Sequence, residues 1–123
     1  MAHLLVIDDE ADIRFMLTVF FEHDGHTVDT ADNGKVGVLL PEQNHYDLVI
    51  TDMLMPVMDG IEVVTAIKTK SPATRIIVHT GGSARIDKYN LLNIAVAMRA
   101  NKVVAKPLDF GVLKAAVNEV LAG

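Results

Sequence analysis

Acidic side chains follow two of the most apolar runs in the sequence. Asp8, Asp9 and Glu10 come directly after the run HLLVI, and Asp52 comes directly after LVIT. A carboxylate at the end of a buried strand needs a cation or hydrogen-bond donors, because burying an unpaired charge is costly. Two carboxylates about 4 Å apart repel by about 4 kcal/mol at an effective dielectric constant near 20. If folding brings these acids together, they form a site for a cation.

A hydroxyl and an ammonium group follow other apolar runs. Thr80 comes after RIIVH, and Lys106 comes after VVA. Taken singly, each polar residue has an ordinary explanation: a helix cap for Asp8 or Asp9, a turn for Asp52 or Thr80, a solvated loop position for Lys106. None of these explanations accounts for carboxylates, a hydroxyl and an ammonium group at the ends of separate runs.

The elements that would position these groups alternate along the chain. Apolar runs predict strands at residues 3–7, 27–31, 48–51, 75–79 and 103–105. A segment with apolar residues at helical spacing follows each run, and this alternation predicts a parallel sheet covered by helices on both faces. The carboxyl ends of parallel strands meet at one edge, where ligands bind. The run at 27–31 is less apolar and has no polar group of this kind after it, so we expect it at the edge of the sheet.

Capping residues and apolar spacing define the helices. Asn33, Asp59 and Asp109 are the expected N-caps, and Pro41 is expected to end or distort the helix that follows Asn33. Met53, Met55 and Met58 are expected to pack in a loop. The side chains predicted to face inward are Ile13, Met16, Leu17, Phe20 and Phe21; then Ile61, Val64 and Ile67; then Leu91, Ile94, Ala95 and Met98; and finally Leu113, Ala116, Val117, Val120 and Leu121.

Composition narrows the class of protein. The 123 residues, half of them apolar and 22% charged, fit one globular domain over residues 1–123. There is no cysteine, and the five histidines show no metal-ligand spacing, so His79 is expected to be structural. A net charge of −5 without a basic run argues against nucleic acid as the direct partner. No apolar run is long enough to span a membrane and no signal peptide is evident, so we expect a cytoplasmic protein without membrane insertion.

Phosphoryl transfer is the chemistry that these side chains predict. Mg²⁺ prefers oxygen ligands and typically uses one or two carboxylates together with phosphate oxygens and water. Asp52 is placed to act as the nucleophile and form an acyl phosphate. Lys106 would neutralise charge, and the Thr80 hydroxyl would donate a hydrogen bond to a phosphoryl oxygen. Little other covalent machinery is needed, because phosphoryl transfer depends mainly on positioning and charge stabilisation.

Four motifs together resemble the receiver domain of two-component response regulators: VIDDE, DLVITDMLMPVMDG, VHTGGS and AKP. The resemblance covers the whole chain and implies an α/β, flavodoxin-like (βα)5 fold with a five-stranded parallel sheet of order 2-1-3-4-5. It also implies that a sensor histidine kinase or a histidine phosphotransfer protein phosphorylates Asp52. The phosphorylated form would then bind a downstream target protein through the region of the fourth strand, fourth helix and fifth strand. Such a protein is a phosphoacceptor that promotes its own phosphorylation and dephosphorylation, and is not an enzyme.

The resemblance also assigns the metal ligands. Asp9 and Asp52 correspond to direct ligands of Mg²⁺, or of Mn²⁺ in its place. The backbone carbonyl of Leu54 corresponds to the third protein ligand, and Asp8 would act mainly through water.

The predicted switch departs from the family pattern in two ways. Thr80 corresponds to the switch hydroxyl, and Lys106 corresponds to the lysine that pairs with the phosphoryl group. The resemblance also implies that the Lys106–Pro107 peptide bond is cis. The position three residues before the lysine is commonly aromatic in the family but is Val103 here. The stretch from Thr80 to Lys106 is also about one helical turn longer than usual. We therefore expect residues 81–102, rather than Val103, to carry most of the change on phosphorylation.

Several functional alternatives remain open. The chain stops right after the fifth predicted helix, so we expect a stand-alone receiver, which could drive a response or act as a phosphate sink. A flavin or nucleotide module needs a cradle of backbone N–H groups after the first strand, where DDEAD places anions instead. A metal-dependent phosphohydrolase with Asp8 as the nucleophile would usually carry a cap or substrate domain, for which this chain has no room.

Overall fold

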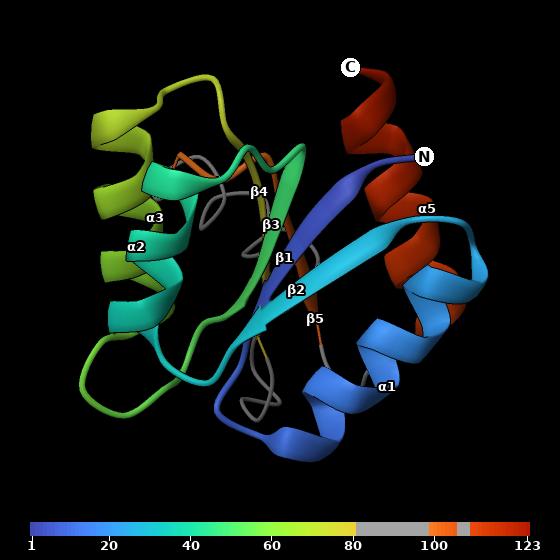
Figure 1. Cartoon of the computed structure of the whole chain (residues 1–123), viewed down its shortest axis with the longest axis horizontal. Helices are drawn as coiled ribbons and strands as arrows, with labels where there is room; N and C mark the ends of the chain where they lie inside the picture. Colours follow the sequence, from blue (N-terminus) through green and yellow to red (C-terminus); the bar gives the residue numbers. More distant parts are fainter. Residues whose placement is uncertain (81–98, 106–108) are drawn as a thin grey trace.

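A five-stranded parallel sheet forms the centre of the computed structural model, which describes residues 1–80, 99–105 and 109–123. The strands are β1 (His3–Ile7), β2 (Thr27–Ala31), β3 (Leu48–Asp52), β4 (Arg75–Thr80) and β5 (Lys102–Ala105). The helices are α1 (Ala11–His23), α2 (Gly34–Gln43), α3 (Gly60–Lys70) and α5 (Phe110–Ala122). The strand order is β2-β1-β3-β4-β5, which confirms the predicted topology and places β3 in the middle (Figure 1). The helix expected around Leu91–Met98 lies outside the described residues.

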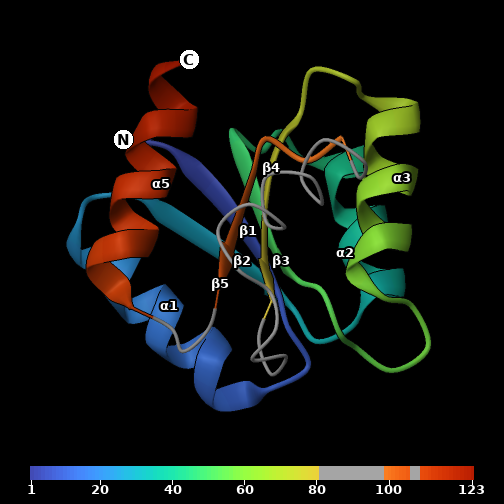
Figure 2. The same ribbon diagram turned by 180° about the vertical axis from the view of Figure 1, so that it is seen from behind.

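Helices cover both faces of the sheet. Helices α1 and α5 lie on one face, and α2 and α3 lie on the other (Figures 1 and 2). Side chains alternate between the faces along each strand. Leu4 and Val6 belong to the core cluster under α1 and α5, whereas Leu5 and Ile7 belong to the cluster under α2 and α3. The central strands β1 and β3 are mainly apolar because both of their faces are buried, whereas the edge strand β2 is more polar and partly exposed.

Side-chain caps fix where three of the helices begin. Asn33, Asp59 and Asp109 each accept a hydrogen bond from the backbone N–H three residues further on, as predicted. Asp59 and Glu62 also complete a reciprocal capping box at the start of α3. No helix in the described ranges is both long and apolar enough to cross a membrane.

Pro41 was expected to end or distort its helix, and it does not end it. Helix α2 continues to Gln43 and contains Pro41. The backbone and the side-chain amide of Asn44 both donate to the carbonyl oxygen of Leu40, at 3.0 and 3.2 Å. These bonds close the last turn of α2. The hydrogen bond that Pro41 cannot donate, to the carbonyl of Gly37, is a separate loss close to the end of the helix.

Two side chains predicted to face inward lie at the surface instead. Met16 is 40% exposed because Leu17 and Phe21 occupy the buried side of α1. Ile61 is 49% exposed because the buried side of α3 is formed by Val63, Val64 and Ile67. Both residues sit about a quarter of a turn or more from the true inner face, an offset that apolar spacing alone does not resolve.

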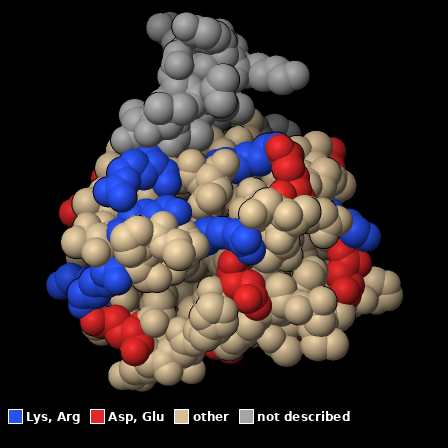
Figure 3. Space-filling view, turned by 90° about the horizontal axis from the view of Figure 1, so that it is seen from above, with Lys and Arg blue, Asp and Glu red and all other residues tan. Residues whose placement is uncertain are grey.

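The amino ends of the strands carry charges of both signs. In the view from above, Lys and Arg side chains alternate with Asp and Glu side chains over this face (Figure 3). The loops that follow the strands lie at the opposite end of the molecule (Figure 1). The site predicted from the sequence therefore belongs to that opposite end.

Candidate functional site

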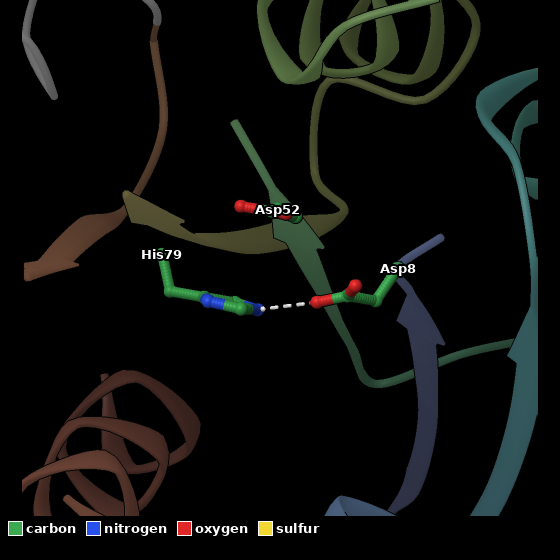
Figure 4. A group of neighbouring side chains, drawn as sticks. All are labelled: Asp8, Asp52 and His79. Atoms are coloured by element: carbon green, nitrogen blue, oxygen red, sulfur yellow. Dashed lines mark ion pairs between the residues drawn. The ribbon is translucent and has the colours of Figure 1, made fainter. Parts of the chain in front are cut away.

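Three buried polar side chains meet at the carboxyl ends of β1, β3 and β4 (Figure 4). Asp8 and His79 are fully buried, and Asp52 is 4% exposed. One nitrogen of His79 and one oxygen of each carboxylate lie within 4.8 Å of one another. These three residues are far apart in the sequence, so the sheet itself brings them together.

Strand register explains why the three side chains share a pocket. Asp52 and His79 are register partners on β3 and β4, and Thr51 pairs with Ile7, the residue before Asp8. Because side chains alternate along strands, Asp8 follows Val6 onto the α1–α5 side of the sheet. Asp52 follows Ile50 and His79 follows Ile77 onto the same side, since Ile50 and Ile77 belong to the same core cluster. On this side of the sheet, each of the three polar side chains thus follows an apolar side chain of its own strand, and the three strands are neighbours.

Asp8 is held by contacts on several sides. The backbone N–H of Glu10 donates to Oδ1 of Asp8 at 2.9 Å, and Nε2 of His79 lies 3.3 Å from Oδ2. The guanidinium of Arg14 donates to the backbone carbonyl of Asp8 at 2.8 Å. Helix α1 begins at Ala11, so the positive end of its dipole also lies beside the acids. These groups offset part of the cost of burying carboxylates next to one another.

The remaining predicted site residues differ in their exposure to solvent. Asp9 is exposed, and Leu54 is 67% exposed in the loop that follows β3. Thr80 is the last residue of β4 and is 3% exposed. Lys106 lies outside the described residues. The structure thus brings Asp8 and Asp52 together and places Asp9, Leu54 and Thr80 at the ends of the same strands.

The loop after β3 packs against the core rather than into the site. Met55 is 9% exposed within the cluster under α2 and α3, and Met53 and Met58 pack against that cluster. The expectation of loop packing for these methionines is therefore confirmed. Their burial holds the segment between Asp52 and α3 against the sheet.

The donor set at this edge suits a hard divalent ion. Two buried carboxylates, the exposed carboxylate of Asp9 and the backbone carbonyl of Leu54 are all oxygen ligands, the kind that Mg²⁺ prefers. A divalent cation would also relieve the repulsion between Asp8 and Asp52. The residues present therefore fit a magnesium ion.

Reasoning from the sequence did not place His79 in this group. A histidine at a strand end is usually structural. The separation of His79 from Asp8 and Asp52 along the sequence does not match a known metal-ligand spacing. The signal lay in the strand register: His79 pairs with Asp52 and therefore shares its side of the sheet. Among the described residues, neither ring nitrogen of His79 has a hydrogen-bond partner. A buried polar group left in this state costs about 1–3 kcal/mol, so the placement of His79 calls for an explanation.

Comparison with known proteins points to one family. Residues 4–118 match the response regulator receiver domain. The chain is 31% identical over 121 residues to response regulator ArlR of Staphylococcus epidermidis, covering 98% of this chain and 53% of that protein. It is 42% identical over 77 residues to transcriptional regulatory protein ResD of Bacillus subtilis, covering 63% of this chain and 32% of that protein. The chain thus spans about half the length, or less, of these curated relatives.

Solved structures agree with this assignment. A response regulator receiver domain protein from Clostridium thermocellum superposes with a TM-score of 0.87 at 32% identity, over 99% of this chain and 95% of that one. Response regulator TrrA of Thermotoga maritima, solved in complex with Mg²⁺ and BeF, gives a TM-score of 0.82 at 32% identity, over 98% and 99% of the two chains. Receiver domains are phosphoacceptors that bind Mg²⁺ in an acidic pocket and interact with histidine kinases or phosphotransfer proteins. The sheet order, the acidic pocket and the match over residues 4–118 show that this chain belongs to the response regulator receiver domain family.

Proposed function

We propose that Asp52 accepts a phosphoryl group from the phosphohistidine of a sensor kinase or of a histidine phosphotransfer protein. The observation that carries the proposal is the position of Asp52 at the carboxyl end of the central strand, 4% exposed and beside a second buried carboxylate. Asp8 lies deeper, fully buried against His79, and Asp9 lies at the surface. Of the three, Asp52 combines a position at the end of the central strand with a small remaining exposure of 4%.

The proposed transfer needs little from the protein beyond position and charge. A carboxylate oxygen of Asp52 forms a bond to phosphorus as the bond between phosphorus and the donor histidine nitrogen breaks. The released imidazole takes a proton from water. The reacting form of Asp52 is the carboxylate, so the step requires no general base. Stabilising charge comes from the amino end of α1, from Arg14 and, as the sequence predicts, from Lys106 and the Thr80 hydroxyl.

A bound Mg²⁺ ion would neutralise part of the negative charge of the phosphoryl group and the carboxylates. In the proposed site, Asp9, Asp52 and the Leu54 carbonyl would hold the ion, and Asp8 would act through water. Asp8 is well placed for an indirect role, because the Glu10 N–H and the His79 ring fix its orientation. A carboxylate held in this way can orient water molecules around the ion.

The proposed output is a changed protein-binding surface beside β4 and β5. Phosphorylation adds about −1.5 to −2 units of charge, and Thr80 ends the strand next to Asp52. Val103 is buried on β5 as the register partner of Val78, and it offers no aromatic ring to reorient. The stretch from Thr80 to Lys106, in which we expect the change, lies mainly outside the described residues.

The proposed phosphodonor protein docks over α1. Helix α1 begins three residues after Asp8, so a donor that reaches this edge of the sheet passes over its first turns. Phe15 is 70% exposed and Val19 is 52% exposed there. An apolar surface of this kind marks a protein interaction site. We call it the α1 patch, and it is formed by Phe15, Met16, Val19, Phe20, His23 and Phe110.

Labelling of variants tests the phosphoacceptor. The wild-type protein is incubated with acetyl phosphate and Mg²⁺, and the product is examined by intact mass and by its sensitivity to hydroxylamine. Asp52→Asn should abolish the adduct. Asp59→Asn is a matched control, because asparagine also caps a helix and Asp59 lies outside the buried group. Unchanged labelling of Asp52→Asn would exclude this residue as the acceptor. Multiple turnover of small phosphate esters would instead favour a phosphohydrolase.

A further inference from the structure

The imidazole of His79 is the least expected group in the acidic pocket. The ring is fully buried and points toward Asp8, and Asp52 lies beside the two side chains (Figure 4). Neither Nδ1 nor Nε2 has a hydrogen-bond partner in the part of the chain that the structure describes. Buried side-chain polar atoms nearly always have such a partner. A buried imidazole ring without such partners is therefore expected to bind a group that takes up the lone pair of a ring nitrogen, as a metal ion does.

The contact between His79 and Asp8 is not a well-formed hydrogen bond. Nε2 lies 3.3 Å from Oδ2 of Asp8, whereas charge-assisted N–H···O bonds are about 2.7–2.9 Å long. Two ligands held about 2.1 Å from one tetrahedral metal ion are about 3.4 Å apart. The observed separation matches this spacing between two ligands better than it matches a hydrogen bond.

We propose that His79 is a metal ligand, and that Asp8, Asp52 and His79 together bind a transition ion of the Zn²⁺ and Co²⁺ class. The candidate ligand atoms lie within 4.8 Å of one another, so modest side-chain movements suffice to surround an ion. Imidazole suits zinc and cobalt, whereas Mg²⁺ takes oxygen ligands. His79 is thus the residue that sets which ion this pocket prefers.

Binding of such an ion has a consequence that rests on the proposed function. Asp52 would be a ligand of this ion and is also a proposed ligand of Mg²⁺, so the two ions would exclude each other from the pocket. Zn²⁺ would therefore inhibit phosphorylation by displacing the Mg²⁺ that supports it. Metal binding itself is independent of this consequence and is measured without any phosphodonor.

The first experiment is titration of the metal-free protein with Zn²⁺, followed by calorimetry, and with Co²⁺, followed by visible absorption. We expect one ion per chain. His79→Val should weaken Zn²⁺ binding by at least about tenfold and leave Mg²⁺ binding within about threefold. His45→Gln is the control for binding by surface histidines, because the His45 side chain is 86% exposed and lies outside the cluster. Equal Zn²⁺ affinity in wild type and His79→Val would overturn the proposal. So would parallel changes for Zn²⁺ and Mg²⁺, which would make His79 only a counter-ion of Asp8.

A second measurement uses the wild-type chain and does not depend on the folding of a variant. Pulsed electron paramagnetic resonance of the Cu²⁺-loaded protein detects a directly bound imidazole nitrogen, because Cu²⁺ favours imidazole ligands. Labelling histidine with ¹⁵N should change that signal, and the signal should persist in His45→Gln. Absence of nitrogen coupling would overturn the assignment. If Zn²⁺ binds through His79 but Asp52→Asn is still phosphorylated, the metal site stands and the proposed function fails.

Discussion

Gly60 lies directly against the main chain of Asp52. A Cβ atom built on Gly60 would lie 2.6 Å from the carbonyl oxygen of Asp52 and 2.8 Å from Cα of Met53. The N–H of Gly60 also donates to the carbonyl of Met53 at 2.8 Å. Both neighbours are backbone atoms, so neither can move aside without shifting the end of β3. The glycine after Asp59 thus lets α3 start close to the site.

Gly60→Ala should therefore destabilise the protein. We expect a loss of about 2 kcal/mol in the free energy of unfolding, because the added methyl group overpacks a rigid contact. Gly111→Ala is the control: its nearest neighbour would be a side-chain oxygen of Asp109 at 3.2 Å, and alanine favours the helix. Urea unfolding of both variants gives the comparison. Equal stability of Gly60→Ala and wild type would show that the loop can relax.

Val57 lies in the same loop with a left-handed backbone. Its φ is 71°, and its side chain is 80% exposed. A β-branched residue is strained in this region, whereas asparagine tolerates it. Val57→Asn should raise the free energy of unfolding by about 1 kcal/mol. Val19→Asn on α1 serves as the control and should give no gain, since Val19 is a helical residue. A loss of stability in Val57→Asn would show that the valine side chain contributes contacts of its own.

Asp8 and Asp52 crowd two carboxylates into one buried pocket, which predicts an effect of metal removal. Without metal, Asp52→Asn should be as stable as wild type or more stable by up to about 2 kcal/mol, because one of two repelling charges is removed. With Mg²⁺ at about 100 times its dissociation constant, wild type should gain about 2.7 kcal/mol, and the variant should gain less. Thermal melts with Mg²⁺ and with EDTA measure both effects. A marked loss of metal-free stability in Asp52→Asn would mean that this carboxylate is structural.

The positions of the strands could be predicted from the sequence because apolar runs with polar ends have a single interpretation here. The runs at residues 3–7 and 27–31 coincide with β1 and β2. The meeting of Asp8 and Asp52 followed from the rule that parallel strands share a carboxyl edge. That rule needs only the order of elements, not their register.

The position of His79 in the site and the inner faces of the helices could not be predicted from hydrophobic patterns in the sequence alone. His79 joins the site only because it pairs with Asp52, and register is a property of the assembled sheet. Met16 and Ile61 were predicted to be buried because apolar residues stand on both sides of the true inner face. Tertiary packing selects among such residues.

Tyr46 and Asp29 provide a test of pH dependence at the other end of the sheet. The Tyr46 hydroxyl donates to Oδ2 of Asp29 at 2.7 Å. Burial, followed by this hydrogen bond and the charge of Asp29, raises the pKa of Tyr46 well above its usual range. A raised pKa in the folded state means that stability is fully present below the unfolded pKa, near 10, and is lost as the pH rises above it.

Comparison with Tyr46→Phe isolates this effect. At pH 8 the variant should be about 1 kcal/mol less stable, because it lacks the hydrogen bond to Asp29. Above pH 10 the advantage of wild type should shrink by up to about 1.4 kcal/mol per pH unit, since only unfolded Tyr46 ionises. Urea unfolding between pH 8 and 11 follows the difference. A difference that stays constant over this range would contradict the raised pKa.

The α1 patch should matter for a protein phosphodonor and not for a small one. Acetyl phosphate needs only to reach Asp52, whereas a kinase or phosphotransfer protein must also contact the surface beside it. Phe15→Ser removes the most exposed aromatic ring of the α1 patch, at 70% exposure. Truncating an aromatic anchor typically costs about 2 kcal/mol of binding, so the rate of transfer from the protein donor should fall by about tenfold or more. Labelling by acetyl phosphate should be unchanged.

Leu39→Ser is the matched control for this prediction. Leu39 is 56% exposed on α2, which covers the opposite face of the sheet from α1 (Figure 1). The Leu39→Ser substitution removes a comparable amount of exposed apolar surface at a distance from the proposed contact. Transfer from a phosphorylated histidine phosphotransfer protein is followed as loss of label from the donor. Equal slowing in both variants would indicate a general effect on folding or solubility. Unchanged transfer to Phe15→Ser would place the donor on another surface, while leaving the assignment of Asp52 intact.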